Sequence, residues 1–147
     1  MAMKTLEYLP GITREEARIL RERGIRHTNQ LLHICTLHLD RETVARKTGI
    51  SSERLLNFAH ECALLEISGM DRFIPVVRRF GIGDLKILKK QDPTELHARL
   101  VQAIGMGAPT PAMVQYWVSQ ARTCDMIEEY EPAASEISPS LISQKVR

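Results

Sequence analysis

The sequence has few of the residues that mark disulfide-built, membrane-spanning or aromatic-rich proteins. Three cysteines among 147 residues are too few and too scattered for a disulfide framework. Aromatic residues make up 5% of the chain. No apolar run reaches the roughly 20 residues of a membrane-spanning helix, and the N-terminal segment lacks the apolar stretch of a secretion signal. These absences predict a cytoplasmic protein with reduced thiols and no membrane partner.

The sequence also lacks a strong charge of either sign and any motif of catalysis. The net charge is +2, which by itself gives no support for nucleic-acid binding. No nucleophile elbow, phosphate loop or carboxylate pair is present, so we predict no enzymatic activity, cofactor or small-molecule substrate. His33, Cys35 and His38 lie close together, but no second pair stands at ligand spacing, so we predict no metal site.

What is present is a succession of helix signals without strand alternation. Thr13 and Glu16 form a capping box, and residues 55–65 carry an apolar stripe at helical spacing. Pro93 and Pro111 each follow a capping residue, as at the first position of a helix. The sequence predicts about eight short helices in an all-α fold. "GIGDLKILKK" provides one of the starts, and the other predicted N-caps are Thr13, Thr28, Asp40, Ser51, Asp71, Asp92 and Thr110.

The chain contains an internal repeat. "LPGI" at 9–12 aligns with "ISGM" at 67–70, and "RERGI" at 21–25 aligns with "VRRFGI" at 77–82. Each copy continues with a short helix. We therefore expect one helical domain over 1–125, made of two packed pseudo-repeats at about 6–65 and 66–125. Residues 126–147 are rich in Glu, Pro, Ser and Ala, which predicts a flexible tail.

The chain resembles a bacterial family, the domain of unknown function 4332. The resemblance covers roughly residues 6–125, and it rests on "LPGIT", "RGIRHTNQLL", "ARKTGISSERLLNFA", "ISGMDR", "DPTELHARL" and "MVQYWVSQA". It implies an all-α fold with two helix-hairpin-helix-like halves packed as one domain, and it implies no activity. Likeness to nucleic-acid-binding hairpins is an analogy of fold alone.

Hairpins that bind phosphate read Gly-apolar-Gly, because a Cβ would block the approach of the backbone. The two copies of the repeat read Gly11-Ile12-Thr13 at the first corner of the chain and Gly69-Met70-Asp71 at the second. Neither has the second glycine, and Asp71 places a negative charge where a phosphate would sit. The strict pattern occurs as Gly81-Ile82-Gly83, among the densest basic residues of the chain. The candidate nucleic-acid contacts are Gly81, Gly83, Arg78, Arg79, Lys86, Lys89 and Lys90, with Gly11, Thr13 and Arg14 at the first corner.

Two functions remain open at this point. The chain is an accessory domain that contacts a DNA or RNA backbone without reading its sequence, or it is an adaptor that binds a protein partner and no nucleic acid. Arg18 and Glu22 stand at ion-pairing distance on the first helix, which favours a solvated charged face there. An adaptor predicts a contiguous apolar surface patch.

Overall fold

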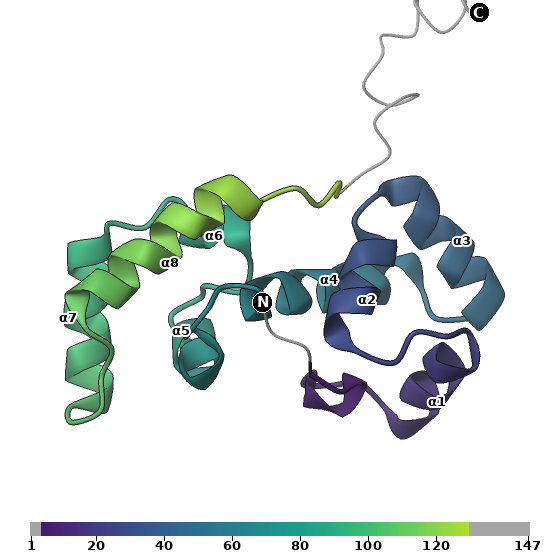
Figure 1. Cartoon of the computed structure of the whole chain (residues 1–147), viewed down its shortest axis with the longest axis horizontal. Helices are drawn as coiled ribbons and strands as arrows, with labels where there is room; N and C mark the ends of the chain where they lie inside the picture. Colours follow the sequence, from purple (N-terminus) through teal and green to yellow (C-terminus); the bar gives the residue numbers. More distant parts are fainter. Residues whose placement is uncertain (1–3, 130–147) are drawn as a thin grey trace, which may run out of the picture.

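Short helices that reverse direction at glycine turns make up the structure, a computed structural model that describes residues 4–129 (Figure 1). Within these residues there is no strand, which confirms the predicted all-α fold, and no helix is long and apolar enough to cross a membrane. The elements are η1 (Leu6–Tyr8), α1 (Arg14–Glu22), α2 (Thr28–Cys35), α3 (His38–Thr48), α4 (Ser52–Leu65), η2 (Asp71–Phe73), α5 (Ile74–Arg79), α6 (Leu85–Leu88), α7 (Pro93–Ile104) and α8 (Pro111–Cys124).

The two sequence corners have the same backbone geometry. In the turns 9–12 and 67–70, the N–H of the fourth residue donates to the carbonyl of the first, at 3.3 and 3.2 Å. The third residue is Gly11 (φ +83°) in one turn and Gly69 (φ +79°) in the other. This combination requires glycine at the third position, because a Cβ is strained at positive φ.

The helices after these corners also end alike. A glycine follows the last residue of each helix after one intervening residue: Gly24 after α1 and Gly81 after α5, with φ of +85° and +88°. The next residue, Ile25 or Ile82, donates its N–H to the carbonyl five residues earlier at 3.0 Å. Both isoleucines are buried, so each turn is anchored by the apolar contact that accompanies this helix ending. The repeat in the sequence is therefore a repeat of local structure.

The repeat extends to the packing of the helices. In each half the fourth helix packs against the second and third: α4 against α2 and α3, and α8 against α6 and α7. The buried stripes correspond as well, with Phe58 and Ala59 of α4 matching Trp117 and Val118 of α8. In Figure 1, α4 lies between the group α1–α3 and the group α5–α8.

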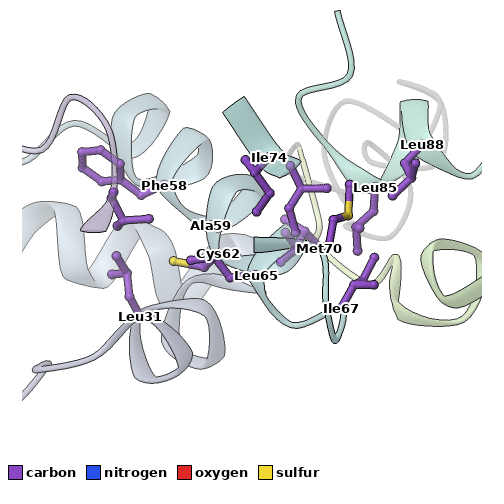
Figure 2. Packing of buried hydrophobic residues seen from close by; sticks show 14 of the residues in the cluster. Leu31, Phe58, Ala59, Cys62, Leu65, Ile67, Met70, Ile74, Leu85 and Leu88 are labelled. Atoms are coloured by element: carbon purple, nitrogen blue, oxygen red, sulfur yellow. The ribbon is translucent and has the colours of Figure 1, made fainter. Parts of the chain in front are cut away.

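One apolar core runs through both halves. Figure 2 shows Leu31, Phe58 and Cys62 continuing into Met70, Leu85 and other buried side chains of the second half. In the second half the Trp117 ring is fully buried, with its centroid 5.5 Å from that of Phe73. The halves are thus joined by burial of apolar surface, the dominant stabilising contribution in folding.

Four predicted N-caps are confirmed by side-chain hydrogen bonds, and three helix starts differ from the prediction. Thr13, Ser51, Asp92 and Thr110 each accept a backbone N–H of their first turn. Thr28 is instead the buried first residue of α2, and its hydroxyl accepts from the N–H of Lys4. Asp71 opens a 3-10 turn without capping it and pairs with Lys4 at 3.3 Å. α3 begins at His38, and its N-cap is Leu37, three residues before the predicted N-cap Asp40.

The predicted tail is ordered at its beginning. Within residues 126–129, Met126 is exposed, but Ile127 is buried and Glu128 N donates to Thr36 O at 2.9 Å. In Figure 1 this segment crosses from the end of α8 towards α2 and α3. Composition alone predicts a flexible segment here, because it takes no account of a single isoleucine that the fold can bury. The rest of the predicted tail, 130–147, lies outside the described residues.

Candidate functional site

Side chains of the protein itself make hydrogen bonds and an ion pair at the first corner. Thr13 N donates to Glu16 Oε1 at 2.9 Å, and Glu16 N donates to Thr13 Oγ1 at 3.0 Å. The guanidinium of Arg54, from α4, donates to both oxygens of Glu16 and to Gly11 O. The hydrogen bond from Arg54 lowers the pKa of Glu16, so this acid stays ionised beside the turn. Arg14 is exposed and has no ion pair among residues 4–129.

The remaining arginines of α1 form the solvated face predicted from the sequence. Arg18 pairs with both Glu15 and Glu22, and Arg21 pairs with Glu7 of η1. These pairs are exposed, so they add little stability, but they leave the face nearly neutral. This arrangement gives no support for contact between these two arginines and a phosphate backbone.

The second basic cluster is also largely paired with acids. Arg78 donates to Glu61 at 2.7 Å, and Lys86 and Lys89 both donate to Asp125, at 2.8 and 2.7 Å. Burial opposes the ionisation of Asp125, but the hydrogen bonds from the two lysines lower its pKa on balance. A phosphate would have to displace a carboxylate from each of these three basic residues.

The Gly81-Ile82-Gly83 turn itself is open. Gly81 and Gly83 are exposed, and a Cβ at either position meets no atom within 4 Å. Asp84 caps α6 by accepting from Ile87 N at 2.9 Å. Arg79 and Lys90 are exposed and have no ion pair within the described part of the chain. Of the basic residues predicted near this turn, these two are the ones that remain available to a partner.

The two corners flank one cleft of about 360 Å³ between the halves. Tyr8, Leu9 and Pro10 lie on one side, and Ile74 and Pro75 on the other. The corners are therefore neighbours. The charged groups at the cleft include both signs, because Glu61, Asp71 and Arg78 line it too, so it presents no continuous positive face.

A second hollow, which we name the elbow groove, lies where α2, α4, α6 and the segment after α8 meet. It encloses about 440 Å³. The segment after α8 forms one wall and is held in place by Ile127 and Glu128, since His38 N donates to Glu128 Oε1 at 2.9 Å. The lining residues are Leu32, His33, Thr36, Leu37, Asp40, Ala63, Glu66, Leu85, Cys124, Met126 and Ile127.

Large apolar side chains are exposed around the elbow groove. Met126 is 72% exposed, and Leu37 is 48% exposed at the junction of α2 and α3. Ile34 and Leu39, on either side of this junction, are 36% and 71% exposed, but they do not line the groove. The sequence analysis did not single out these residues, although the run "ICTLHLD" carries more apolar residues than one buried helix face can use. Leu37 and Met126 thus bring exposed apolar surface to one hollow, a feature typical of binding sites.

The charged side chains lining the elbow groove are acidic. Glu66, at the end of α4, has one carboxylate oxygen (Oε2) that is buried and has no hydrogen-bond partner among the described residues. Burial raises the pKa of Glu66. Asp40 lines the same groove, and no lysine or arginine does. A buried carboxylate oxygen without a donor is costly, so this oxygen is a natural acceptor for a partner's cation.

Comparison with known proteins identifies a family that the chain matches over most of its length. The family described as Domain of unknown function (DUF4332) matches residues 10–124, which is most of the chain. No curated protein and no solved structure gives a significant match.

Proposed function

We propose that this chain, which belongs to the DUF4332 family, is a non-enzymatic adaptor that holds an apolar, basic helical segment of a protein partner in the elbow groove. The family brings no activity with it, so the proposal rests on the surface of the molecule. Of the two hypotheses, nucleic-acid contact and protein adaptor, we choose the adaptor. The reason is that the groove combines exposed apolar residues with an acidic lining.

Leu37 carries the proposal. It occupies the N-cap of α3, makes no capping hydrogen bond and is half exposed. In the second half the corresponding N-cap, that of α7, is Asp92, which accepts from Thr94 N at 2.8 Å. Leucine is among the poor N-caps, and a good one adds about 1 kcal/mol. Leu37 therefore neither caps α3 nor is fully buried. A residue that departs from the local rules of stability in this way is typical of a functional site.

The acidic lining gives the partner its charge. Glu66 Oε2 lacks a donor, and Asp40 is exposed at the same groove. A Lys or Arg of the partner would satisfy the Glu66 oxygen, whereas an acidic partner would be repelled. We therefore expect apolar residues at helical spacing with a cation between them.

A display library of amphipathic helical peptides, selected on the whole chain, tests the proposal. We expect enriched peptides to combine apolar residues at i, i+3 or i+4 with Lys or Arg, and to bind by calorimetry. Leu37→Asn should weaken binding about tenfold or more and leave the protein at least as stable, because asparagine is a good N-cap. Glu66→Gln should weaken it too. Val101→Asn, at an exposed apolar position on α7, should bind as the wild type does.

The combined result separates docking from folding, because the weakened Leu37 variant is expected to be stable. The proposal is wrong if no peptide is enriched, if the enriched peptides are acidic, or if they bind Leu37→Asn and Glu66→Gln as tightly as the wild type.

A second candidate function is contact with a DNA or RNA backbone through the turn 81–83. It is supported by the open turn and by two cations beside it, Arg79 and Lys90, that have no ion pair within residues 4–129. Fluorescence anisotropy with labelled duplex and single strands should then show binding that weakens as salt rises and that Gly83→Ala reduces, because a Cβ would block the backbone. No binding even at low salt would exclude this function.

We also infer the finer features that the sequence predicts. The positive-φ corners support helix-hairpin-helix-like halves, and the family resemblance supports a bacterial source. Cys35, Cys62 and Cys124 are free thiols in the structure, which supports a reducing, cytoplasmic location.

A further inference from the structure

A histidine and two carboxylates meet on the side of the molecule where the halves join. His60 comes from the middle of α4, Asp84 caps α6, and Glu129 lies in the segment after α8. One ligand atom from each lies within 4.8 Å of the others, and His60 Nε2 is 3.1 Å from Glu129 Oε2. No two of them are close in sequence, so spacing along the chain gives no sign of the cluster.

The spacing of these atoms suits a metal ion. Ligand atoms bound to Zn²⁺ at about 2.0–2.2 Å stand roughly 3.4 Å apart around a tetrahedron. The His60–Glu129 distance of 3.1 Å is close to this spacing. The Asp84 oxygen lies within 4.8 Å of the other two ligand atoms, so a bound ion would draw the three atoms closer together. One imidazole nitrogen with two carboxylate oxygens is a donor set that first-row divalent ions accept.

Neighbouring contacts hold the three groups in place. Oδ1 of Asp84 accepts from Ile87 N at 2.9 Å, which fixes the carboxylate and leaves its second oxygen free. The side chain of His60 is 12% exposed. Glu129 follows Glu128, whose backbone and side chain both bond to the α2–α3 junction. Contacts outside the cluster thus position Asp84 and the segment that carries Glu129, and burial restricts the side chain of His60.

One cation lies close enough to compete with a metal. Lys86 binds Asp125, which is the main reason for its raised pKa, and Glu129 and Asp84 raise that pKa further. Lys86 therefore lies within the negative potential of the cluster. Removing its charge should strengthen metal binding without freeing Asp125, because Lys89 also holds that carboxylate.

We propose that His60, Asp84 and Glu129 bind one first-row divalent transition-metal ion, with Zn²⁺ as the test ion and water completing the coordination. The ion joins α4, α6 and the segment after α8, and so links the two halves. It is independent of the proposed partner, although the segment it fixes also forms a wall of the elbow groove.

The test uses the full chain, stripped with EDTA and desalted, then titrated with Zn²⁺ by calorimetry and with Co²⁺ by visible absorption. We expect one site per chain. His60→Gln, Glu129→Gln and Asp84→Asn should each weaken binding about tenfold or more. Asparagine is as good an N-cap as aspartate, so Asp84→Asn keeps the start of α6. Lys86→Met should bind several-fold more tightly.

Two controls keep the result specific. His97→Gln on α7 and Glu53→Gln on α4 lie outside the cluster and should bind as the wild type does. Circular dichroism without metal establishes that each variant is folded. The proposal is overturned if no saturable binding of either ion is found, if the three ligand variants bind like the wild type, or if His97→Gln loses the site instead.

Discussion

Ile127→Ala tests whether the segment after α8 belongs to the folded domain. Ile127 is 6% exposed, in a stretch whose composition predicts a flexible tail. The substitution removes three side-chain carbons. At about 0.8 kcal/mol for each buried methylene, the loss is roughly 2 kcal/mol. For a domain of this size, that lowers the melting temperature by about 8 °C.

Urea denaturation followed by circular dichroism measures this loss. Met126→Ala is the matched control, because Met126 is the neighbouring residue and 72% exposed. It should change stability by less than about 0.5 kcal/mol. The midpoint should shift for Ile127→Ala while the slope stays the same, as for a change in stability alone.

Hydrogen exchange gives the second readout. The amide of Glu128 donates to Thr36 O, so it should be protected in the wild type and exchange faster in Ile127→Ala. If the segment undocks before the protein unfolds, the measured loss equals the free energy of docking and is below 2 kcal/mol. Equal stability of both variants, together with an unprotected Glu128 amide, would refute the docked segment.

Three further predictions follow from single contacts. Gly81→Ala should destabilise by about 1 kcal/mol because φ is +88°, whereas Gly83→Ala should be nearly neutral, by thermal denaturation. Trp117→Ala should lose about 3–5 kcal/mol in urea, but Trp117→Phe much less, because it removes a buried Nε1–H that has no acceptor in the described residues. Asp125 has a lowered pKa, so its contribution is complete above about pH 4 and is lost as the pH falls; the stability difference between wild type and Asp125→Asn should shrink on acidification.

Local signals predicted the helices well, because the groups that start and stop a helix are close in sequence. Ser51 and Thr110 bond within their own first turns, and Gly49 and Gly105 end helices at positive φ. Thr28 escaped the same reasoning, since its hydroxyl accepts from Lys4, 24 residues away. Where a distant partner takes the capping atom, sequence patterns place the helix start wrongly.

The candidate site could be predicted far less well, because its charges are neutralised by distant residues. Counting basic residues near 78–90 identifies a positive cluster. The structure shows that Asp125, 39 residues from Lys86, neutralises part of it. The elbow groove is assembled from four separate parts of the chain, so its lining has no sequence motif. The sequence feature that points to the groove is the apolar run "ICTLHLD", which contains Leu37, a residue that the structure leaves half exposed.

The elbow groove lies where the two halves have diverged. α2 has eight residues and its counterpart α6 has four, so the first half carries an extra turn before its third helix. Where the second half has the polar run "KKQD" ending in the cap of α7, the first has "LHICTL" ending in Leu37. Glu128 replaces the missing cap by accepting from His38 N. The shared architecture builds the core, whereas the unshared turn and the segment after α8 build much of the elbow groove. A function specific to the first half therefore predicts that Leu37→Asp, which gives α3 the cap residue of α7, should preserve folding and abolish peptide binding.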